Sequence, residues 1–236
     1  VAVVGAPGQN EVYYTIVYSG GELGQLWGPE RVGVNDDGTV QYADINGDGV
    51  VNDASIEGFN ADQKQIGDAI PAFELGLNNT FTMGRWDLNF LLRGVFGHDL
   101  VNEYRVFYEN LDPTASTWNK VKTDYFDANV TGKNRYNSYH VENATFLRLD
   151  NATLGYNFKL PANSWFNKCR AYVNGQNLFT ITDYSGVDPE ARVGDSGNVD
   201  NGGRQSLSLN PLAPGIDRRS TYFLARTISF GVNLGF

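Results

Sequence analysis

The sequence predicts an all-β fold whose long strands are part of a transmembrane β-barrel, and three observations favour this prediction. Five segments alternate large apolar residues with small or polar residues, as membrane-crossing strands do. The connections between these segments are alternately short and long, which is the arrangement of turns and outer loops in an outer-membrane barrel. The mean hydropathy is −0.36 and no run of about eighteen apolar residues occurs, so no membrane-spanning helix is expected.

The first expected region, residues 1–70, is an extracellular loop region rich in Gly, Asn and Asp. Within it, residues 44–55 read D-I-N-G-D-G-V-V-N-D-A-S and match the first half of a calcium-binding loop. The usual acid at loop position twelve is replaced by Ser55, so Asp53 or Glu57 would have to substitute. An acidic turn that binds no ion is the alternative. The expected calcium ligands are Asp44, Asn46, Asp48, the carbonyl of Val50, and Asp53.

The second expected region, residues 71–236, carries the barrel strands. The first two alternating segments flank the short Gly84-Arg85 turn and therefore form a hairpin. The third and fourth segments are joined by another short connection, and the last segment ends the chain. The expected strands are 71–83, 86–97, 144–160, 169–182 and 220–236.

The last strand shows the alternation over the greatest length. Large apolar residues occupy one face at period two, whereas small and polar residues such as Ser229 and Gly231 occupy the other. Lipid on one side and a wet lumen on the other explain this division. The residues expected to face lipid are Tyr222, Leu224, Ile228, Phe230, Val232 and Leu234.

Two long segments, 98–143 and 183–219, separate the strand pairs and lack a clear period. Long connections are rare inside compact domains but are usual on the outer side of membrane barrels. We therefore expect both segments to be outer loops that face the cell exterior. The first loop contains eight aromatic residues, and its Tyr and Trp side chains offer flat, amphipathic contact surface.

Charge and reactive residues argue against several other functions. The net charge of −9 disfavours nucleic acid as a partner. A single cysteine, Cys169, excludes an internal disulfide. The two histidines, His98 and His140, have no spaced nucleophile beside them, and no phosphate-binding glycine loop opens a helix. We therefore predict that the protein is not an enzyme.

A family resemblance rests on three runs in the sequence and on several shorter features around them. The shorter features are G-G-E-L-G-Q-L-W-G near the start, Ile66-Gly67 ahead of Pro71-Ala72-Phe73, and the last strand. Taken together and in this order, they resemble the C-terminal part of SusC/RagA-type TonB-dependent outer-membrane transporters of Bacteroidota. The three runs are Tyr42–Asp53, Asn143–Phe158 and Ala171–Glu190.

This resemblance implies a barrel of about 22 strands in the outer membrane, plugged by an N-terminal domain that this sequence does not contain. It implies import of oligosaccharides or oligopeptides with a SusD-like surface lipoprotein as a cap, and energy supplied through TonB. The remaining partners would be the rest of the same barrel and outer-membrane lipid. Cap or substrate contacts are expected at Tyr104, Tyr108 and Trp118.

Strand number supports the expectation that the chain is part of a longer protein. Five or six strands cannot close a barrel, because about eight are the practical minimum. The chain also begins at Val1, without an initiator Met. The alternatives are a secreted β-sandwich binding module stapled by calcium, and a surface adhesin; dependence on detergent would separate them from a membrane barrel.

Overall fold

The computed structural model describes residues 2–6, 9, 12–52, 62–109, 121–132, 134–190, 197–199, 205–207, 212–219 and 221–236. The chain divides into two compact units, which are treated separately below. The strand unit comprises Ala72–Phe96, Thr145–Asp183 and Phe223–Phe236, and the loop unit comprises Val1–Pro71, Gly97–Ala144 and Tyr184–Tyr222. Among the described residues, no helix is long and apolar enough to cross a membrane.

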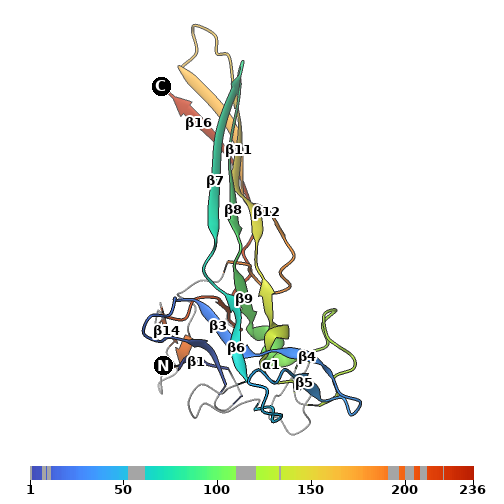
Figure 1. The fold of residues 1–236 in the computed structure, drawn as a ribbon. Helices are drawn as coiled ribbons and strands as arrows, with labels where there is room; N and C mark the ends of the chain where they lie inside the picture. Colours follow the sequence, from blue (N-terminus) through green and yellow to red (C-terminus); the bar gives the residue numbers. More distant parts are fainter. Residues whose placement is uncertain are drawn as a thin grey trace. The chain divides into compact units, whose positions relative to one another are not determined.

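The strand unit is one antiparallel sheet of five strands in the order β16-β12-β11-β8-β7 (Figure 1). The sandwich alternative requires two sheets packed face to face, and this single sheet gives it no support. The all-β prediction is confirmed. The strands are β7 (Phe73–Met83), β8 (Trp86–Phe96), β11 (Phe146–Asn157), β12 (Lys168–Thr182) and β16 (Thr227–Gly235).

The last strand begins at Thr227, later than the expected Ser220, so Tyr222 and Leu224 lie outside it. Its ladder with β12 ends where Gln176 pairs with Thr227. The next residue of β12, Asn177, has a positive φ of 50°, which turns the backbone away from the regular ladder. Its side-chain Nδ2 donates to the carbonyl of Ala225 at 3.2 Å in place of a ladder bond.

Strand register separates the side chains of this sheet into an apolar face and a polar face. Phe230 pairs with Val173, and Phe81 pairs with Leu88, so large apolar residues line one face across the strands. This face is exposed: Phe230 is 82% and Val232 is 62% accessible. A contiguous exposed apolar surface of this kind is rare in soluble monomers and is expected for the lipid side of a barrel wall.

The opposite face of the same sheet carries ion pairs and hydrogen-bonded amides. Arg93 Nε lies 2.8 Å from Asp150 Oδ2, and Arg170 Nη2 lies 2.5 Å from Asp87 Oδ2. Thr153 Oγ1 donates to Asn174 Oδ1 at 2.8 Å. Charged residues on one face and hydrocarbon on the other match a wall between lipid and a water-filled interior.

The loop unit contains more regular structure than the sequence indicated. Residues 1–70, 98–143 and 183–219 were expected to be loops, but they contribute strands, a helix and a 3₁₀ turn. Their strands have two to six residues, which is too short for a clear period-two signal. The elements are β1 (Ala2–Gly5), β2 (Tyr13–Ile16), β3 (Gln25–Pro29), β4 (Arg31–Val34), β5 (Val40–Tyr42), β6 (Gln63–Asp68), β9 (Asp99–Asn102), α1 (Glu103–Tyr108), η1 (Ser138–His140), β10 (Val141–Asn143), β13 (Gly197–Val199), β14 (Gln205–Leu207) and β15 (Ile216–Asp217).

Two small sheets organise this unit. One has the strand order β1-β2-β3-β6 and the other β10-β9-β15, while β4 pairs with β5 and β13 with β14. The core joins segments far apart in the chain: Tyr14, Leu26, Val101, Tyr136 and Ile216 are all buried in one cluster. The 98–143 and 183–219 segments are therefore tied into a core together with residues from the first region.

Candidate binding site

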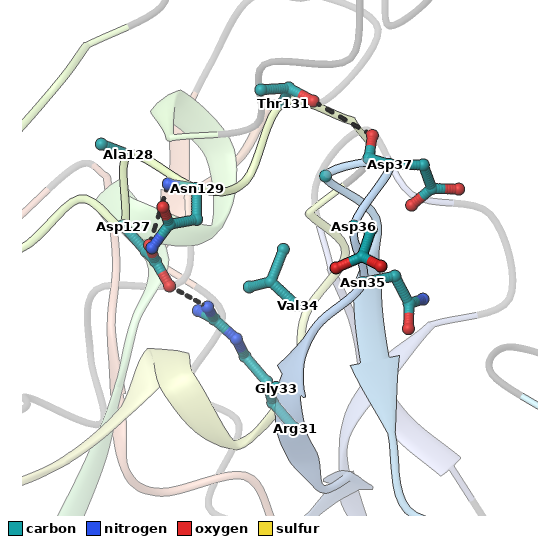
Figure 2. Close-up of a pocket in the computed structure, with 11 residues that line it drawn as sticks. Arg31, Gly33, Val34, Asn35, Asp36, Asp37, Asp127, Ala128, Asn129 and Thr131 are labelled. Carbon is teal, nitrogen blue, oxygen red and sulfur yellow. Dashed lines mark hydrogen bonds and ion pairs between the residues drawn. The ribbon is translucent and has the colours of Figure 1, made fainter.

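A cleft in the loop unit lies between the β4–β5 hairpin and residues 127–131, and it has a volume of about 640 Å³. This volume is in the range of small-molecule binding pockets. Figure 2 shows Asp127 and Asn129 on one side of the cleft and Asp36 and Asp37 on the other, with Val34 between them. The walls thus present carboxylate and amide groups around one apolar side chain.

The two walls of the cleft are fastened to each other at both ends. At one end, the guanidinium of Arg31 on β4 pairs with the carboxylate of Asp127. At the other end, the backbone N–H of Thr131 donates to the carbonyl of Gly38 at 3.0 Å. Gly38 has a φ of +81°, and a Cβ atom there would lie 2.0 Å from Thr131 Oγ1. Only glycine allows this approach, so the sequence itself fixes the width of the cleft.

Two of the carboxylates in the cleft are held in the charged form. Hydrogen bonds from the backbone N–H of Asn129 and then from Arg31 keep the pKa of Asp127 below its usual range. The hydroxyl and backbone N–H of Thr39 do the same for the pKa of Asp37. Hydrogen bonds to an ionised carboxylate favour that form. Both groups are therefore negative at neutral pH.

Arg31 is the cationic residue of the cleft lining. Its side chain is only 9% exposed, and the guanidinium carbon lies 4.6 Å from the ring centroid of Tyr139. Nη2 pairs with Asp127, but Nη1 is buried without a hydrogen-bond partner among the residues that the structure describes. A buried donor without a partner costs free energy.

A second arginine, Arg105 on α1, organises the region behind the cleft. Its Nε lies 3.0 Å from Glu109 Oε2, and its Nη1 lies 2.8 Å from Glu142 Oε1 on β10. The guanidinium also lies over the ring of Tyr139, 4.4 Å from its centroid. The side-chain oxygen of Asn102 caps the helix by accepting from the Arg105 backbone N–H. These contacts fix Tyr139, which also contacts Arg31.

The residues predicted to contact a cap or substrate lie on or near α1. Tyr104 and Tyr108 are half-buried, with ring centroids 6.0 Å apart. The hydroxyl of Tyr104 donates to the carbonyl of Arg219 at 2.8 Å, so this hydroxyl is engaged within the chain. Trp118 lies outside the described residues. Neither tyrosine lines the cleft, and their role in contacts remains a prediction.

The predicted calcium ligands lie in an exposed turn closed by its own hydrogen bonds. Asp44 Oδ1 and Oδ2 accept from the N–H groups of Gly47 and Gly49 at 2.7 and 2.8 Å. Asn46 Nδ2 donates to Asp48 Oδ2 at 2.9 Å. Val50 follows in the exposed backbone. Asp53 lies outside the described residues.

A carboxylate that the sequence did not indicate, Asp62, closes the same turn. Its Oδ1 accepts from the N–H of Ile45 at 2.9 Å and its Oδ2 from the N–H of Asn52 at 2.8 Å. Hydrogen bonds from the backbone, that of Asn52 first, hold the pKa of Asp62 below its usual range. Within the described parts of the chain, no group of three or more His, Cys, Asp or Glu side chains is arranged to hold a metal ion.

His140 on η1 is fully buried, which predicts a pH dependence for the loop unit. Burial, and then the positive charge of Arg105, lower the pKa of His140 from 6.5 to about 3. The unfolded chain binds a proton below pH 6.5 whereas the folded chain does not, so stability is complete above pH 6.5 and falls toward pH 3. At pH 5 the loss is about 2 kcal/mol, from ~1.4 kcal/mol per pH unit.

A His140→Asn variant tests this pH effect, because its side-chain oxygen can accept the Asn137 N–H bond that Nδ1 now accepts. Hydrogen exchange of residues 136–143, corrected for intrinsic rates, should lose protection between pH 7 and pH 5 in the natural protein. The variant should show a flatter dependence. Equal pH dependence in both proteins would contradict the assignment of the effect to His140.

The cleft was not visible in the sequence because its walls are distant along the chain. Arg31 and Asp127 are separated by 96 positions, and no motif surrounds either of them. The N-D-D-G-T run at residues 35–39 predicts a turn but does not reveal what faces it. Finding the site from sequence would have required information on which distant residues contact each other.

Comparison with known proteins identifies relatives of the chain. The TonB-dependent receptor P3 of Formosa agariphila is 30% identical over 236 residues, which cover 94% of this chain and 21% of the relative. The TonB-dependent receptor SusC of Bacteroides thetaiotaomicron is 29% identical over 174 residues, or 66% of this chain and 16% of the relative. The chain therefore spans about a fifth of the length of such receptors. No protein-family model matches it.

Solved structures of the RagAB peptide importer have a similar fold. In its closed-closed state, the match has a TM-score of 0.65 at 18% identity and covers 90% of this chain and 23% of the RagAB chain. The open-open state gives the same TM-score at 20% identity. At these identities the likeness concerns the fold, and it agrees with the barrel-wall character of the strand unit.

The sequence relatives are TonB-dependent receptors, and the structural neighbours are structures of a peptide importer. None of them is an enzyme, which agrees with the expectation that this chain catalyses no reaction. Proteins of this kind reside in the outer membrane. The two-faced sheet, the sequence relatives and the shared fold together show that the chain belongs to the SusC/RagA-type TonB-dependent transporters and forms part of such a protein.

Proposed function

We propose that the complete protein imports oligosaccharides or oligopeptides across the outer membrane, with energy supplied through TonB and with a SusD-like lipoprotein as its partner. The observation that carries this proposal is the division of the five-stranded sheet into an apolar face and a charged face. The similarity of the sequence to TonB-dependent receptors supports the same conclusion. In this function the strand unit is a section of the barrel wall. Its edge strands β7 and β16 would pair with the rest of the barrel, for which we propose about 22 strands in total.

The loop unit would face the cell exterior and meet the lipoprotein. Its segments share one buried core, so they can present a fixed surface to a partner. Tyr104 and Tyr108 on α1, with Trp118 further along the same segment, are the proposed contacts with the cap or the cargo. Preorganised surfaces bind at a lower entropic cost than flexible ones.

Uptake by living cells tests the proposed function. Cells that express the complete transporter should accumulate labelled oligosaccharides or oligopeptides only when TonB is functional. Purification in detergent should recover the SusD-like lipoprotein together with the transporter. Accumulation that is independent of TonB would contradict the proposal, and a transporter that copurifies with no lipoprotein would remove the partner from it.

Deletion of residues 110–120 from the 98–143 segment tests the outer contact separately from barrel assembly. The deletion should weaken lipoprotein binding or uptake without lowering the amount of transporter in the outer membrane, because the barrel strands are untouched. The measurement is recovery of the lipoprotein relative to assembled transporter. Unchanged capture and unchanged uptake would exclude a role for residues 110–120.

We also propose calcium as a ligand of the 44–52 turn, with Asp62 as an additional carboxylate. The donor set is chemically suitable because all its groups are oxygens, which calcium prefers. Gly47 and Gly49 have φ values of 74° and 81°, which permit the tight backbone. Bound calcium would stabilise the conformation of this turn in the loop unit.

Titration calorimetry of the complete transporter tests the calcium proposal. Calcium should bind to the natural protein, and Asp44→Asn should weaken that site by about tenfold, or ~1.4 kcal/mol. Asp124→Asn, at an exposed position outside the turn, is the matched control and should change nothing. If the natural protein gives no calcium-dependent heat that Asp44→Asn removes, the turn is held by its hydrogen bonds alone.

A further inference from the structure

The residue Arg226 carries a charge in a register of large apolar side chains. It lies two positions before Ile228 and four before Phe230, which are 57% and 82% exposed on the apolar face of the sheet. The side-chain Nδ2 of Asn177 donates to the carbonyl of Ala225 at 3.2 Å and holds this part of the backbone beside β12. Arg226 is exposed, and its guanidinium has no hydrogen bond or ion pair within the part of the chain that the structure describes. The period-two register therefore places a cation without a partner on the side that faces lipid.

The position of Arg226 along the strand determines its depth in the membrane. Phe236 lies at the turn end of the sheet, where its ring is 5.1 Å from that of Phe166 and its carbonyl accepts from Asn167 Nδ2 at 2.6 Å. The ten residues from Arg226 to Phe236 span roughly 33 Å along a strand. With the tilt of about 40° that strands have in membrane barrels, the height is roughly 25 Å, which is the height of the apolar band of such barrels. Arg226 therefore lies at the membrane boundary opposite to Phe236.

Exposed aromatic side chains support the two boundaries that follow from this length. At the turn end, Trp165 is 92% and Phe236 is 86% exposed. Just beyond Arg226 at the other boundary, Phe223 is 79% exposed. Aromatic girdles lie at both interfaces of membrane barrels. The guanidinium of Arg226 is therefore at the level of lipid headgroups rather than of acyl chains.

The chemistry of a guanidinium at this level favours an anionic headgroup. Its planar set of N–H donors matches the oxygens of a phosphate, to which it can bind through two parallel hydrogen bonds. The long connections of the chain leave the sheet at the end opposite to the turns, and in the proposed function they face the cell exterior. The boundary at Arg226 then belongs to the outer leaflet, whose main lipid in outer membranes is lipopolysaccharide, with phosphates on its lipid A.

We propose that Arg226 binds a phosphate group of lipopolysaccharide in the outer leaflet. The contact satisfies the cation at the edge of the apolar face and fixes the barrel wall at its outer boundary, as basic residues do with anionic headgroups. The inference rests on the proposed orientation, with the loop unit at the cell exterior. It adds a lipid partner to the transporter and does not concern the cargo.

Native mass spectrometry of the complete transporter in detergent tests the phosphate contact. The probes are lipid A and the same lipid A without its phosphates, and the measurement is the fraction of transporter with bound lipid during a titration. The natural protein should bind the phosphorylated lipid about fivefold more tightly. Arg226→Gln should remove this preference, whereas Arg226→Lys keeps the cation and should retain part of it.

Arg85→Gln is the matched control, because Arg85 is an exposed arginine in the turn between β7 and β8, at the opposite end of the same sheet. It should leave the preference for phosphate unchanged. Equal binding of the two lipids, or an unchanged preference in Arg226→Gln, would overturn the proposal. Phosphatidylglycerol bound as tightly as lipid A, with the same dependence on Arg226, would overturn the assignment to lipopolysaccharide. The TonB-dependent uptake assay is read separately, so a failed lipid contact and a failed import function give different results.

Discussion

Phe230→Lys in β16 is expected to prevent most of the transporter from assembling in the outer membrane. Phe230 is 82% exposed on the apolar face, where Ile228 and Val232 flank it along the strand. A lysine on the lipid side of a barrel costs about 2–4 kcal/mol at the membrane midplane. This cost is a large fraction of the stability of a folded protein, and the variant should accumulate at a low level.

Ser229→Lys is the matched control because it introduces the same side chain at the neighbouring position. Ser229 pairs with Asn174 and lies on the polar face, so a lysine there would meet water rather than hydrocarbon. The amount of each variant in isolated outer membranes, compared with the natural protein, is the measurement. Equal amounts of both variants would show that the two faces are assigned incorrectly.

The long strands could be predicted from the sequence because they obey a local rule. Phe73–Met83 and Trp86–Phe96 alternate over eleven residues each, and a short turn with Gly84 at a φ of +64° joins them. In such a hairpin, the residues next to each other in sequence also determine the pairing in space. The alternation predicts the strands, whereas the family resemblance predicts that they belong to a barrel whose remaining strands lie outside this chain.

The limits of β16 could not be predicted in the same way. The apolar pattern continues backward from Thr227 through Leu224 and Tyr222, but the ladder stops because Asn177 on the neighbouring strand leaves the regular conformation. A strand end is therefore determined by its partner as well as by its own sequence. Pattern alone contains no information about the partner's backbone.

The loop unit depended on contacts that no local pattern reveals. Its small sheet pairs β9 with β10 and with β15, and the β15 partners Ile216 and Asp217 lie more than a hundred residues from Val101 and Asn102. Short strands with distant partners give almost no periodic signal. For the same reason the sequence indicated the tyrosines of α1 but not the cleft, which is formed by Arg31 and Asp127.

Arg105→Gln is expected to destabilise the loop unit by about 3–5 kcal/mol, because it removes the cation from between the buried Glu109 and the partly buried Glu142. The Arg105 side chain is 6% exposed and the Glu109 side chain is 0% exposed, so water cannot replace the lost partner. Thr123 also donates to Glu109, but a neutral hydroxyl does not balance the charge. Glu142 loses its ion pair at the same time.

An exposed ion pair of the same unit provides the control for Arg105→Gln. Lys64 and Glu30 lie 2.5 Å apart, but their side chains are 42% and 38% exposed. Water and salt weaken such a pair, and its loss in Lys64→Gln should cost less than about 1 kcal/mol. The same change to glutamine therefore removes one cation in each variant, with burial as the main difference.

Hydrogen exchange of the complete transporter distinguishes the two variants. In Arg105→Gln, α1 and β10 should lose protection, because both are held by the same guanidinium, while β8 and β11 of the strand unit should retain theirs. Lys64→Gln should leave protection unchanged throughout. If the two variants lose protection equally, the buried arginine contributes no more than a surface pair. Selective loss would instead mean that one guanidinium holds together the elements behind the cleft, because Tyr139 contacts both Arg105 and Arg31.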